Sequence, residues 1–504
     1  MRRLDGGPLG DIAPGMFAAW LMDGGEFGAT SGLQSALASA PHGPARLFAS
    51  GWRPADDLLD ELDPEHIEHL EDLCGKLADG RAAVVVTGQQ PGFLGGPLYT
   101  LYKIATAVAL ARSRTLNGHP TVPVFWSADD DTDLAEALAA VAWLPGLRRV
   151  VRSGGREYLK RRDLRGRMVG TLSSSILHHS FAREMEGRGI GPGCLPWAEL
   201  IEQAIDLDWP LSRMLTVFWT RLFAADGLIV LSGDDPRLHA SAGDLSAELR
   251  TRTAELAALV RSRGEDLREH GGHAQLDERS LRQPWYGSDG TRRQPLAAAD
   301  PQDPSTLRPG VLMRSAIQDW LLGPVAVVAG PGEFAYMKQL EPLFEAVGVP
   351  RCPVVARMSG TIVSPGTSPV EVSPGAADRE SGNLAAVFLE DAEKRLRKLL
   401  TEDVGLDATR SRTLAAERIR RWRKGLTHMV SAQARVVRAS QGPPWLAPLG
   451  RTQERSLAAM GTLLAWGDPF LDAVENAAAV HLDHGLAGDW RTSLFELPAE
   501  GDES

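Results

Sequence analysis

Two glutamines and a cluster of glycines lie between an apolar run and a helical pattern in VVVTGQQPGFLGGPLYTLYK, residues 84–103. Gln89 and Gln90 can each donate and accept hydrogen bonds, and the glycines let a ligand approach the backbone closely. Tyr99 and Lys103, four residues apart, share one face of the helix that follows. The start of that helix favours an anion, because its first N–H groups lack partners within the helix. The segment predicts a site for a phosphate or carboxylate; the alternative is a tight turn in which glycine serves packing alone.

A second glycine loop has the same design. The apolar run Val325–Ala329 is followed by Gly330 and Gly332, and a helical pattern begins at Glu333. Ligands of parallel α/β sheets usually bind at the carboxyl ends of the strands, so both loops are candidate ligand sites. Glu333 could act on a substrate or could simply stabilise the positive end of its helix. The first loop has neither Walker A nor GxGxxG spacing, because Lys103 comes a full helical turn too late.

Four aspartates follow a third apolar run in VPVFWSADDDTD, residues 122–133. Carboxylates at the end of a strand could take up a proton, hold an amine, or bind Mg²⁺ through oxygen. We select Asp131 and Asp133, together with Glu333, as candidate catalytic carboxylates. The alternative is a solvated acidic loop in which one aspartate caps the next helix.

A shorter segment, ARMSGT (residues 356–361), places Arg357 and Ser359 directly after another predicted strand. It is similar to the KMSKS loop of nucleotidyl-transferring enzymes, which steadies ATP phosphates, so both residues are candidate nucleotide-binding groups. The three cysteines form no CxxC pair, which gives no support to a zinc site. We predict no protein metal site and no tightly bound cofactor.

Short runs rich in valine and isoleucine recur at strand length without alternating polarity, which is typical of parallel strands buried on both faces. These runs are Val84–Thr87, Val122–Trp126, Leu228–Ser232, Val325–Ala329 and Pro353–Ala356. Helical patterns lie between them, at Pro97–Ser113, Leu211–Ala225, Ala242–Arg263 and Glu333–Val347. This alternation predicts an α/β fold around a parallel sheet, although the sequence does not give the order of the strands.

Residues 1–380 form the predicted core, with inserts near residues 153–200 and 264–310. Within residues 381–445, apolar side chains recur at 3-4-3 spacing between charged flanks, which predicts an antiparallel coiled-coil hairpin. Such a hairpin could mediate dimerisation; the alternative is a pair of ordinary amphipathic helices on the core. Residues 446–504 are expected to pack back on the core.

Composition restricts the classes of partner. The net charge of −11 argues against nucleic-acid binding as the main feature. The chain contains no run of about 18 uncharged apolar residues, so no membrane span is predicted. Three cysteines in 504 residues fit a reducing compartment. We therefore expect a cytoplasmic protein that acts on small molecules, with neither nucleic acid nor membrane as a partner.

Several segments together resemble one family, the bacillithiol-biosynthesis cysteine-adding enzymes (the BshC family). They occur in the family's order between about residue 84 and residue 470. The segments are VVTGQQPGFLGGPLYTLYK, PVFWSADDDTD, GLIVLSGDDPRL, GGHAQL with the later TRR, VAVVAGPGEFAYMKQLEPLFEAVGVPRCPVVARMS, and TQERSLAAMG. Two of them are long and specific, which makes chance similarity a poor explanation.

The resemblance implies a Rossmann-like core related to nucleotidyl transferases, with inserted connecting segments and a helical coiled coil that forms a homodimer. It also implies a ligase that joins L-cysteine to glucosaminyl malate through an amide bond, the last step of bacillithiol synthesis. Because an amide bond from a free carboxylate is uphill in water, an activated cysteinyl species is expected, with ATP and Mg²⁺ as its source.

The resemblance assigns substrate binding to residues of both glycine loops, namely Thr87, Gly88, Gln89, Gln90, Gly96, Tyr99, Lys103, Gly330, Gly332, Tyr336 and Gln339. It also covers Asp131 and Asp133. One departure is Thr132, where the family usually has a histidine, the side chain suited to carry a proton near neutral pH; Gly272 likewise replaces an aromatic residue. Two alternatives therefore stay open: a related ligase for another amino acid or amino sugar, and a homologue that binds nucleotide or sugar without catalysis.

Overall fold

The structure is a computed structural model. It describes residues 1–8, 29–39, 43–144, 149–153, 164, 166–185, 195–269, 274–297, 303–365, 452–486 and 489–498, with short pieces between 395 and 415. The predicted hairpin at 381–445 lies outside the described residues except for those pieces, and so do Cys194 and Gly272. The coiled coil and the homodimer therefore stay predictions.

A five-stranded parallel sheet forms the centre of the molecule, as the apolar runs predict. Its strands are β2 (Ala83–Gln89), β3 (Thr121–Ser127), β6 (Ile229–Ser232), β10 (Ala326–Ala329) and β11 (Val354–Ala356). They lie in the order β11-β10-β2-β3-β6, and every neighbouring pair is parallel. The prediction of a parallel α/β core is confirmed.

The strand order creates a crevice. The chain enters the sheet at its centre with β2, continues outward through β3 and β6, and then crosses to the other side of β2 to form β10 and β11. The connections that leave β2 and β10 therefore diverge in opposite directions. In open α/β sheets such a switch point is the usual place for a ligand.

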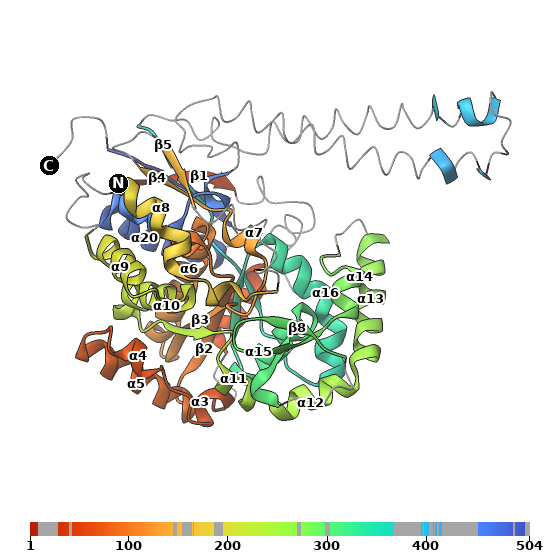
Figure 1. Ribbon diagram of the computed structural model, residues 1–504, viewed down its shortest axis with the longest axis horizontal. Helices are drawn as coiled ribbons and strands as arrows, with labels where there is room; N and C mark the ends of the chain where they lie inside the picture. The colour runs from red at the N-terminus through yellow and green to blue at the C-terminus, as the bar shows by residue number, and fades with distance from the viewer. Residues whose placement is uncertain are drawn as a thin grey trace.

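Helices cover both faces of this sheet (Figure 1). Val85 and Phe125 point to the side of α6 (Leu98–Leu116) and α10 (Leu211–Leu222). Val84 and Val124 point to the opposite side and share a core with α5 (Pro64–Ala78), α13 (Thr253–Glu269) and α15 (Val311–Leu322). Alternate residues of each strand thus enter different cores, which is why the strands read as continuous apolar runs.

The remaining helices are α2 (Ala29–Ala38), α3 (Arg46–Ala49), α4 (Asp56–Leu59), α7 (Leu134–Ala137), α8 (Ser174–Met185), α9 (Leu195–Asp206), α11 (Pro236–Ser241), α12 (Gly243–Thr251), α14 (Glu278–Arg282), α16 (Pro331–Val347), α19 (Ala459–Trp466) and α20 (Asp468–Leu486). One smaller sheet consists of β1 (Arg2–Pro8), β13 (Arg491–Glu496) and β12 (Gly360–Val363), in that order. A hairpin joins β4 (Val141–Leu144) and β5 (Arg149–Arg152), and a third sheet has the order β8 (Arg293–Pro295), β7 (Trp285–Ser288), β9 (Leu307–Pro309).

The predicted continuous helix Ala242–Arg263 is wrong. Two helices, α12 and α13, occupy this segment and meet at Arg252. The Arg252 guanidinium donates to the Ala346 carbonyl of α16 at 2.9 Å, and the Thr253 hydroxyl accepts from the Trp285 indole at 2.9 Å. These tertiary contacts lie at the break between α12 and α13, where the sequence pattern predicts an unbroken helix.

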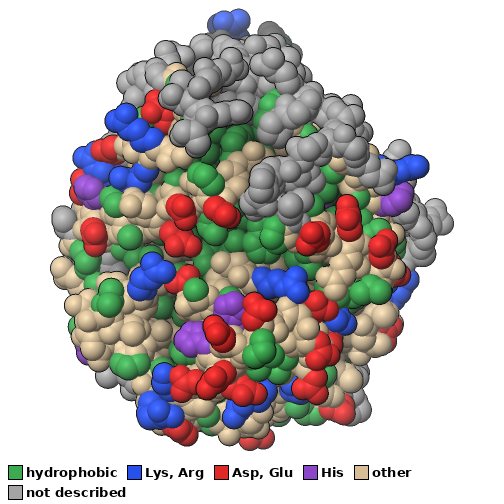
Figure 2. Space-filling model, turned by 90° about the vertical axis from the view of Figure 1, so that its left-hand side faces the viewer, with side chains coloured by type: hydrophobic (Ala, Val, Ile, Leu, Met, Phe, Trp, Pro, Cys, Tyr) green, Lys and Arg blue, Asp and Glu red, His purple; other side chains and the backbone are tan. Residues whose placement is uncertain are grey.

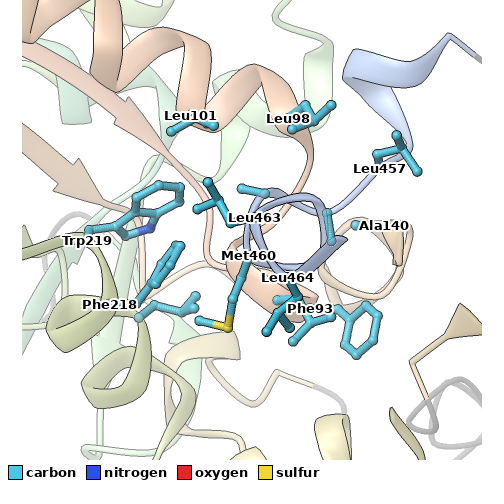
Figure 3. Close-up of a cluster of buried hydrophobic side chains, with 14 of the residues drawn as sticks. Phe93, Leu98, Leu101, Ala140, Phe218, Trp219, Leu457, Met460, Leu463 and Leu464 are labelled. Carbon is cyan, nitrogen blue, oxygen red and sulfur yellow. The ribbon is translucent and has the colours of Figure 1, made fainter. Parts of the chain in front are cut away.

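The C-terminal segment is part of the main core. Figure 3 shows α19 surrounded by side chains of α6 and α10, with Met460 and Leu463 pointing toward them. The Leu457 carbonyl accepts from the Leu98 amide at 2.8 Å, and the Ala459 amide donates to the Gly96 carbonyl at 2.9 Å. The segment is therefore fixed against the first glycine loop, although it comes last in the chain.

Replacing Leu463 with alanine should show how much the packing of α19 contributes to the free energy of unfolding. Leu463 is 1% exposed, so its loss leaves a cavity and is expected to lower the free energy of unfolding by about 2–5 kcal/mol. Leu116→Ala is the matched control, because Leu116 is 82% exposed and its truncation should change stability little. Urea unfolding of both variants measures the difference. Equal stabilities would mean that α19 contributes little to the core.

Among the residues that the structure describes, no helix is both long enough and apolar enough to cross a membrane. Figure 2 shows a face of the molecule on which acidic and basic side chains are interspersed with hydrophobic ones.

Candidate functional site

The carboxyl ends of β2 and β10 border a cleft of about 530 Å³. Both glycine loops and the acidic loop after β3 contribute to its wall. The predicted site residues that line it are Gly88, Gln89, Gln90, Tyr99, Lys103, Asp131, Gly330, Gly332, Glu333, Tyr336 and Arg357. Segments that are far apart in the sequence thus meet at the switch point of the sheet.

Lys103 joins the two glycine loops. Its side chain is only 3% exposed, and its Nζ lies 2.7 Å from Glu333 Oε2. The same ammonium donates to the Gly88 carbonyl and to Gln89 Oε1, each at 2.8 Å. Burial lowers the pKa of Lys103, and the neighbouring Glu333 carboxylate opposes that shift. The positive charge of Lys103 is therefore compensated within the protein, and the side chain holds both loops in place.

Glu333 caps its helix, as one of the two alternatives predicts, and it also borders the cleft, while its action on a substrate stays a prediction. Its Oε2 accepts from the Gly330 N–H at 2.9 Å and so caps α16, while the same side chain lines the cleft. A carboxylate at this position already satisfies the positive end of the helix. An incoming anion would meet a negative charge here.

The first amide of α6 has a partner within the protein. The Leu98 amide donates to the Leu457 carbonyl, so this N–H group is not available to an anion. The first turn of this helix contributes the Tyr99 ring to the cleft instead. Lys103 Nζ and Arg357 Cζ lie 5.8 and 5.6 Å from the centre of that ring, within the range of a cation–π contact.

Asp131 is held as an anion at the edge of the cleft. Its Oδ2 lies 3.8 Å from the Arg314 guanidinium of α15, and its Oδ1 accepts from the Asp133 amide at 2.9 Å. Burial alone would raise the pKa of Asp131, but Arg314, the hydrogen bond from Gln90 and the Asp133 amide outweigh burial and lower it. Asp131 is thus ionised at neutral pH and suited to orient a cation.

The two preceding aspartates are buried beneath the cleft. Asp130 Oδ2 lies 3.2 Å from the Arg293 guanidinium, and Asp130 Oδ1 lies 3.5 Å from Arg314. Burial raises the pKa of Asp129 to about 7, although hydrogen bonds from Ser127 and Ser232 counteract it. Asp130 thus ties the acidic loop to β8 and α15, while Asp129 binds serines at the ends of β3 and β6, and Asp131 is left to line the cleft.

Three consecutive residues, Gln453, Glu454 and Arg455, connect the last part of the described chain to the site, and Arg455 contributes to the cleft wall. Gln453 exchanges two hydrogen bonds of 2.8 Å with the backbone of Ile362 in β12. Glu454 accepts from Arg357 at 3.0 and 3.2 Å and from the Ser359 hydroxyl at 2.5 Å. Arg455 is exposed and lines the cleft, and within the described residues no carboxylate forms an ion pair with it.

Some predicted site residues lie outside the cleft wall. The Thr87 hydroxyl donates to the Val328 carbonyl at 2.8 Å and so links β2 to β10. Gly96 has φ +74°, a backbone conformation that favours glycine. Ser359 binds Glu454 as described, which uses its hydroxyl within the protein.

Asp133 and Gln339 also have structural partners. Asp133 Oδ1 accepts from the Glu136 amide at 3.0 Å and caps α7, which is the alternative stated for one of these aspartates. Gln339 is buried, and its amide group accepts from the Leu276 N–H at 2.8 Å and donates to the Leu276 carbonyl. Thr132 is exposed and does not belong to the residues that line the cleft.

Sequence reasoning missed Glu136, Arg314 and Arg455, which all line the cleft. Glu136 follows directly on the aspartate cluster, so its position was a usable signal. Arg455 lies in the TQER segment, which resembles a family segment, and that resemblance was a usable signal too. Arg314 lies in an ordinary amphipathic helix, and no local pattern distinguishes it. In the described part of the chain, no group of three or more His, Cys, Asp or Glu side chains is placed to hold a metal ion.

Comparison with known families now identifies the chain's relatives. The family described as "Bacillithiol biosynthesis BshC, N-terminal Rossmann-like domain" matches residues 61–300 and 290–358. The chain belongs to the BshC family. The match covers the five-stranded sheet and both glycine loops, so the resemblance inferred from the sequence motifs is confirmed.

Two relatives within the BshC family carry the name "Putative cysteine ligase BshC". The protein of Geobacillus thermodenitrificans is 30% identical over 355 residues, which cover 65% of this chain and 64% of the relative. The protein of Heliobacterium modesticaldum is 29% identical over 426 residues, 73% of each chain. The chain thus spans less than two thirds of the first relative's length. Arginyl-tRNA synthetase of Thermus thermophilus aligns with 92% of this chain and 76% of its own at 14% identity and a TM-score of 0.26, a score too low to indicate a shared fold.

Proposed function

We propose that this protein joins L-cysteine to glucosaminyl malate through an amide bond, in the last step of bacillithiol synthesis. One observation carries the proposal: Lys103 of the first family segment binds Glu333 of the second across the switch point. The two segments with the strongest resemblance to the BshC family therefore form one site. The names of the relatives support the same reaction.

The charges of the cleft support a substrate that carries an amine and carboxylates. Lys103 is balanced by Glu333, Arg357 by Glu454, and Arg314 by the aspartates of the acidic loop. Among the described residues, no carboxylate forms an ion pair with Arg455, which lines the cleft. We assign it to a malate carboxylate of the substrate, because a charge-assisted hydrogen bond is strongest where the donor has no partner inside the protein.

The remaining residues have roles in binding and orientation. The amide groups of Gln89 and Gln90 would bind sugar hydroxyls, and the anionic Asp131 would hold the amine as it enters. Cysteine must arrive as an activated acyl group, and ATP with Mg²⁺ is the proposed source of that activation. Arg357 lies at the cleft where a phosphate of ATP could reach it, although it shares its charge with Glu454.

Arg455→Met is expected to raise KM for glucosaminyl malate by about 10- to 100-fold with little change in kcat, as loss of a hydrogen bond to a charged group implies. The matched control is Arg282→Met, which removes the same charge from a side chain that is 78% exposed and does not line the cleft. Steady-state kinetics of both variants measure the effect. Equal KM values for the two would refute the role of Arg455.

The reaction itself is tested by mass spectrometry of the purified protein with glucosaminyl malate, cysteine, ATP and Mg²⁺, each omitted in turn. A product with the mass of the cysteine amide is expected, and the omissions show whether ATP is required. The same assay with other amino sugars and amino acids distinguishes a related ligase with changed substrates, the alternative that Thr132 motivates. Ligand-induced thermal stabilisation without any product would instead indicate a binding protein.

A further inference from the structure

Glu136 is a carboxylate at the cleft that forms no ion pair within the part of the chain that the structure describes. It lies on the short helix α7, is exposed, and lines the cleft. Its Oε1 accepts from the Gln89 side-chain amide at 3.5 Å, a long hydrogen bond. Within the described residues, no Lys, Arg or His forms an ion pair with it. The Tyr99 side chain also forms a hydrogen bond with this carboxylate, which borders the cleft together with its neutral partners.

The other carboxylates of the cleft are occupied. Asp131 interacts with Arg314 and accepts from the Asp133 amide. Glu333 accepts from the Gly330 amide and binds Lys103. A carboxylate whose oxygens already bind a cation and a backbone N–H group is a weak proton acceptor, because those contacts stabilise its charged form. Among the described residues, neither kind of group is bound to the Glu136 carboxylate in this way.

We propose that Glu136 is the catalytic base that accepts the proton of the attacking amine. This inference rests on the proposed function and deepens it, since it names the group that makes the amine nucleophilic. The neighbouring Asp131 would hold the ammonium form, and Glu136 would then receive its proton. The neutral amine is the form that attacks.

The step balances as follows. Glu136 takes one proton from the ammonium group of the amino sugar. The nitrogen lone pair then forms the C–N bond to the carbonyl carbon of a cysteinyl acyl phosphate or acyl adenylate. The C–O bond to the phosphate breaks, and the phosphate oxygen keeps the electron pair. The second proton leaves the nitrogen for solvent as the amide forms.

The electrostatic surroundings favour this role. Although Glu136 is exposed at the surface of the cleft, the surrounding protein removes part of the water around its carboxyl group and raises its pKa. The nearby carboxylates of Asp133 and Asp131 raise the pKa further, whereas the charge of Lys103 and a hydrogen bond from Tyr99 lower it. A general base works best when its pKa lies near the working pH. The shift moves Glu136 in that direction, while the pKa of Asp131 moves the opposite way.

The test measures kcat against pH for the wild type, Glu136→Gln and Glu136→Asp, with product formation followed by mass spectrometry. Glu136→Gln is expected to lower kcat by about 10²- to 10⁴-fold at neutral pH, the usual contribution of a general base. In the wild type, kcat should rise with pH as Glu136 loses its proton, and this acidic limb should vanish in Glu136→Gln. Glu136→Asp keeps a carboxylate and should retain the limb with reduced activity.

Glu345→Gln is the matched control, because Glu345 is exposed on α16 and does not line the cleft; its kcat profile should equal that of the wild type. Thermal melts establish that all variants are folded. A folded Glu136→Gln variant with wild-type kcat, or with reduced kcat and an intact acidic limb, overturns the role of Glu136 while the proposed function stands. Absence of product from the wild type overturns the proposed function itself, and the base assignment with it.

Discussion

Replacing Lys103 with methionine is expected to lower kcat/KM by about 100-fold or more, because a shift of the reacting groups by about 1 Å can have that effect. Methionine keeps most of the buried volume but cannot bind Glu333, Gln89 or the Gly88 carbonyl, which Lys103 contacts at 2.7–2.8 Å. Both glycine loops would lose the contact that fixes them relative to each other. Steady-state kinetics provide the measurement.

Lys103→Met should change the free energy of unfolding only moderately, whereas its kcat/KM should fall strongly. Glu333 is 40% exposed and can be solvated by water, so no fully buried charge is left behind. The unpaired Gly88 carbonyl and Gln89 oxygen are expected to lower the free energy of unfolding by about 1–3 kcal/mol. Lys76→Met serves as the control, since Lys76 forms an exposed pair with Asp72 and such pairs contribute little. Wild-type kinetics for Lys103→Met would show that the loops keep their positions without the lysine.

Glu454→Gln is expected to lower the free energy of unfolding at pH 7 by about 3–5 kcal/mol, because it removes the carboxylate that binds a buried arginine. Arg357 is 7% exposed and binds both oxygens of Glu454. The glutamine can accept one hydrogen bond but carries no charge. Urea unfolding measures the loss, and Glu255→Gln, in an exposed pair with Arg252, is the control that should change far less.

The effect of Glu454→Gln should depend on pH with a defined sign. Burial alone would raise the pKa of Glu454, but Arg357 and Ser359 outweigh it and lower the pKa. A carboxyl whose pKa is lower in the folded protein stabilises the fold above its unfolded pKa of about 4.3, and this contribution disappears as the pH falls through the folded value. The difference in the free energy of unfolding between wild type and Glu454→Gln should therefore be largest at neutral pH and become smaller in acid. A difference that grows in acid would contradict the ion pair.

Local patterns in the sequence were sufficient for the five strands of the central sheet, although the pattern at Ala242–Arg263 did not show the break between α12 and α13. Val84–Thr87 and Val325–Ala329 read as buried strands because both faces of the parallel sheet are covered, so no polar residue interrupts them. The two glycine loops followed from the same patterns, since each stands between such a strand and a helix. The positions of Gln89, Gln90 and Glu333 near the carboxyl ends of strands follow from these patterns as well.

Pairing between distant segments was decided by the tertiary structure alone. Lys103 and Glu333 belong to loops that meet only because β10 lies beside β2, and the sequence does not encode strand order in any local pattern. Arg314 and Arg455 enter the cleft from α15 and from a C-terminal segment held by α19. Charge compensation across such separations depends on which elements pack together. The sequence by itself thus determined which strands and loops form, whereas the three-dimensional packing determined which charges pair within the described residues, such as Lys103 with Glu333 and Arg357 with Glu454.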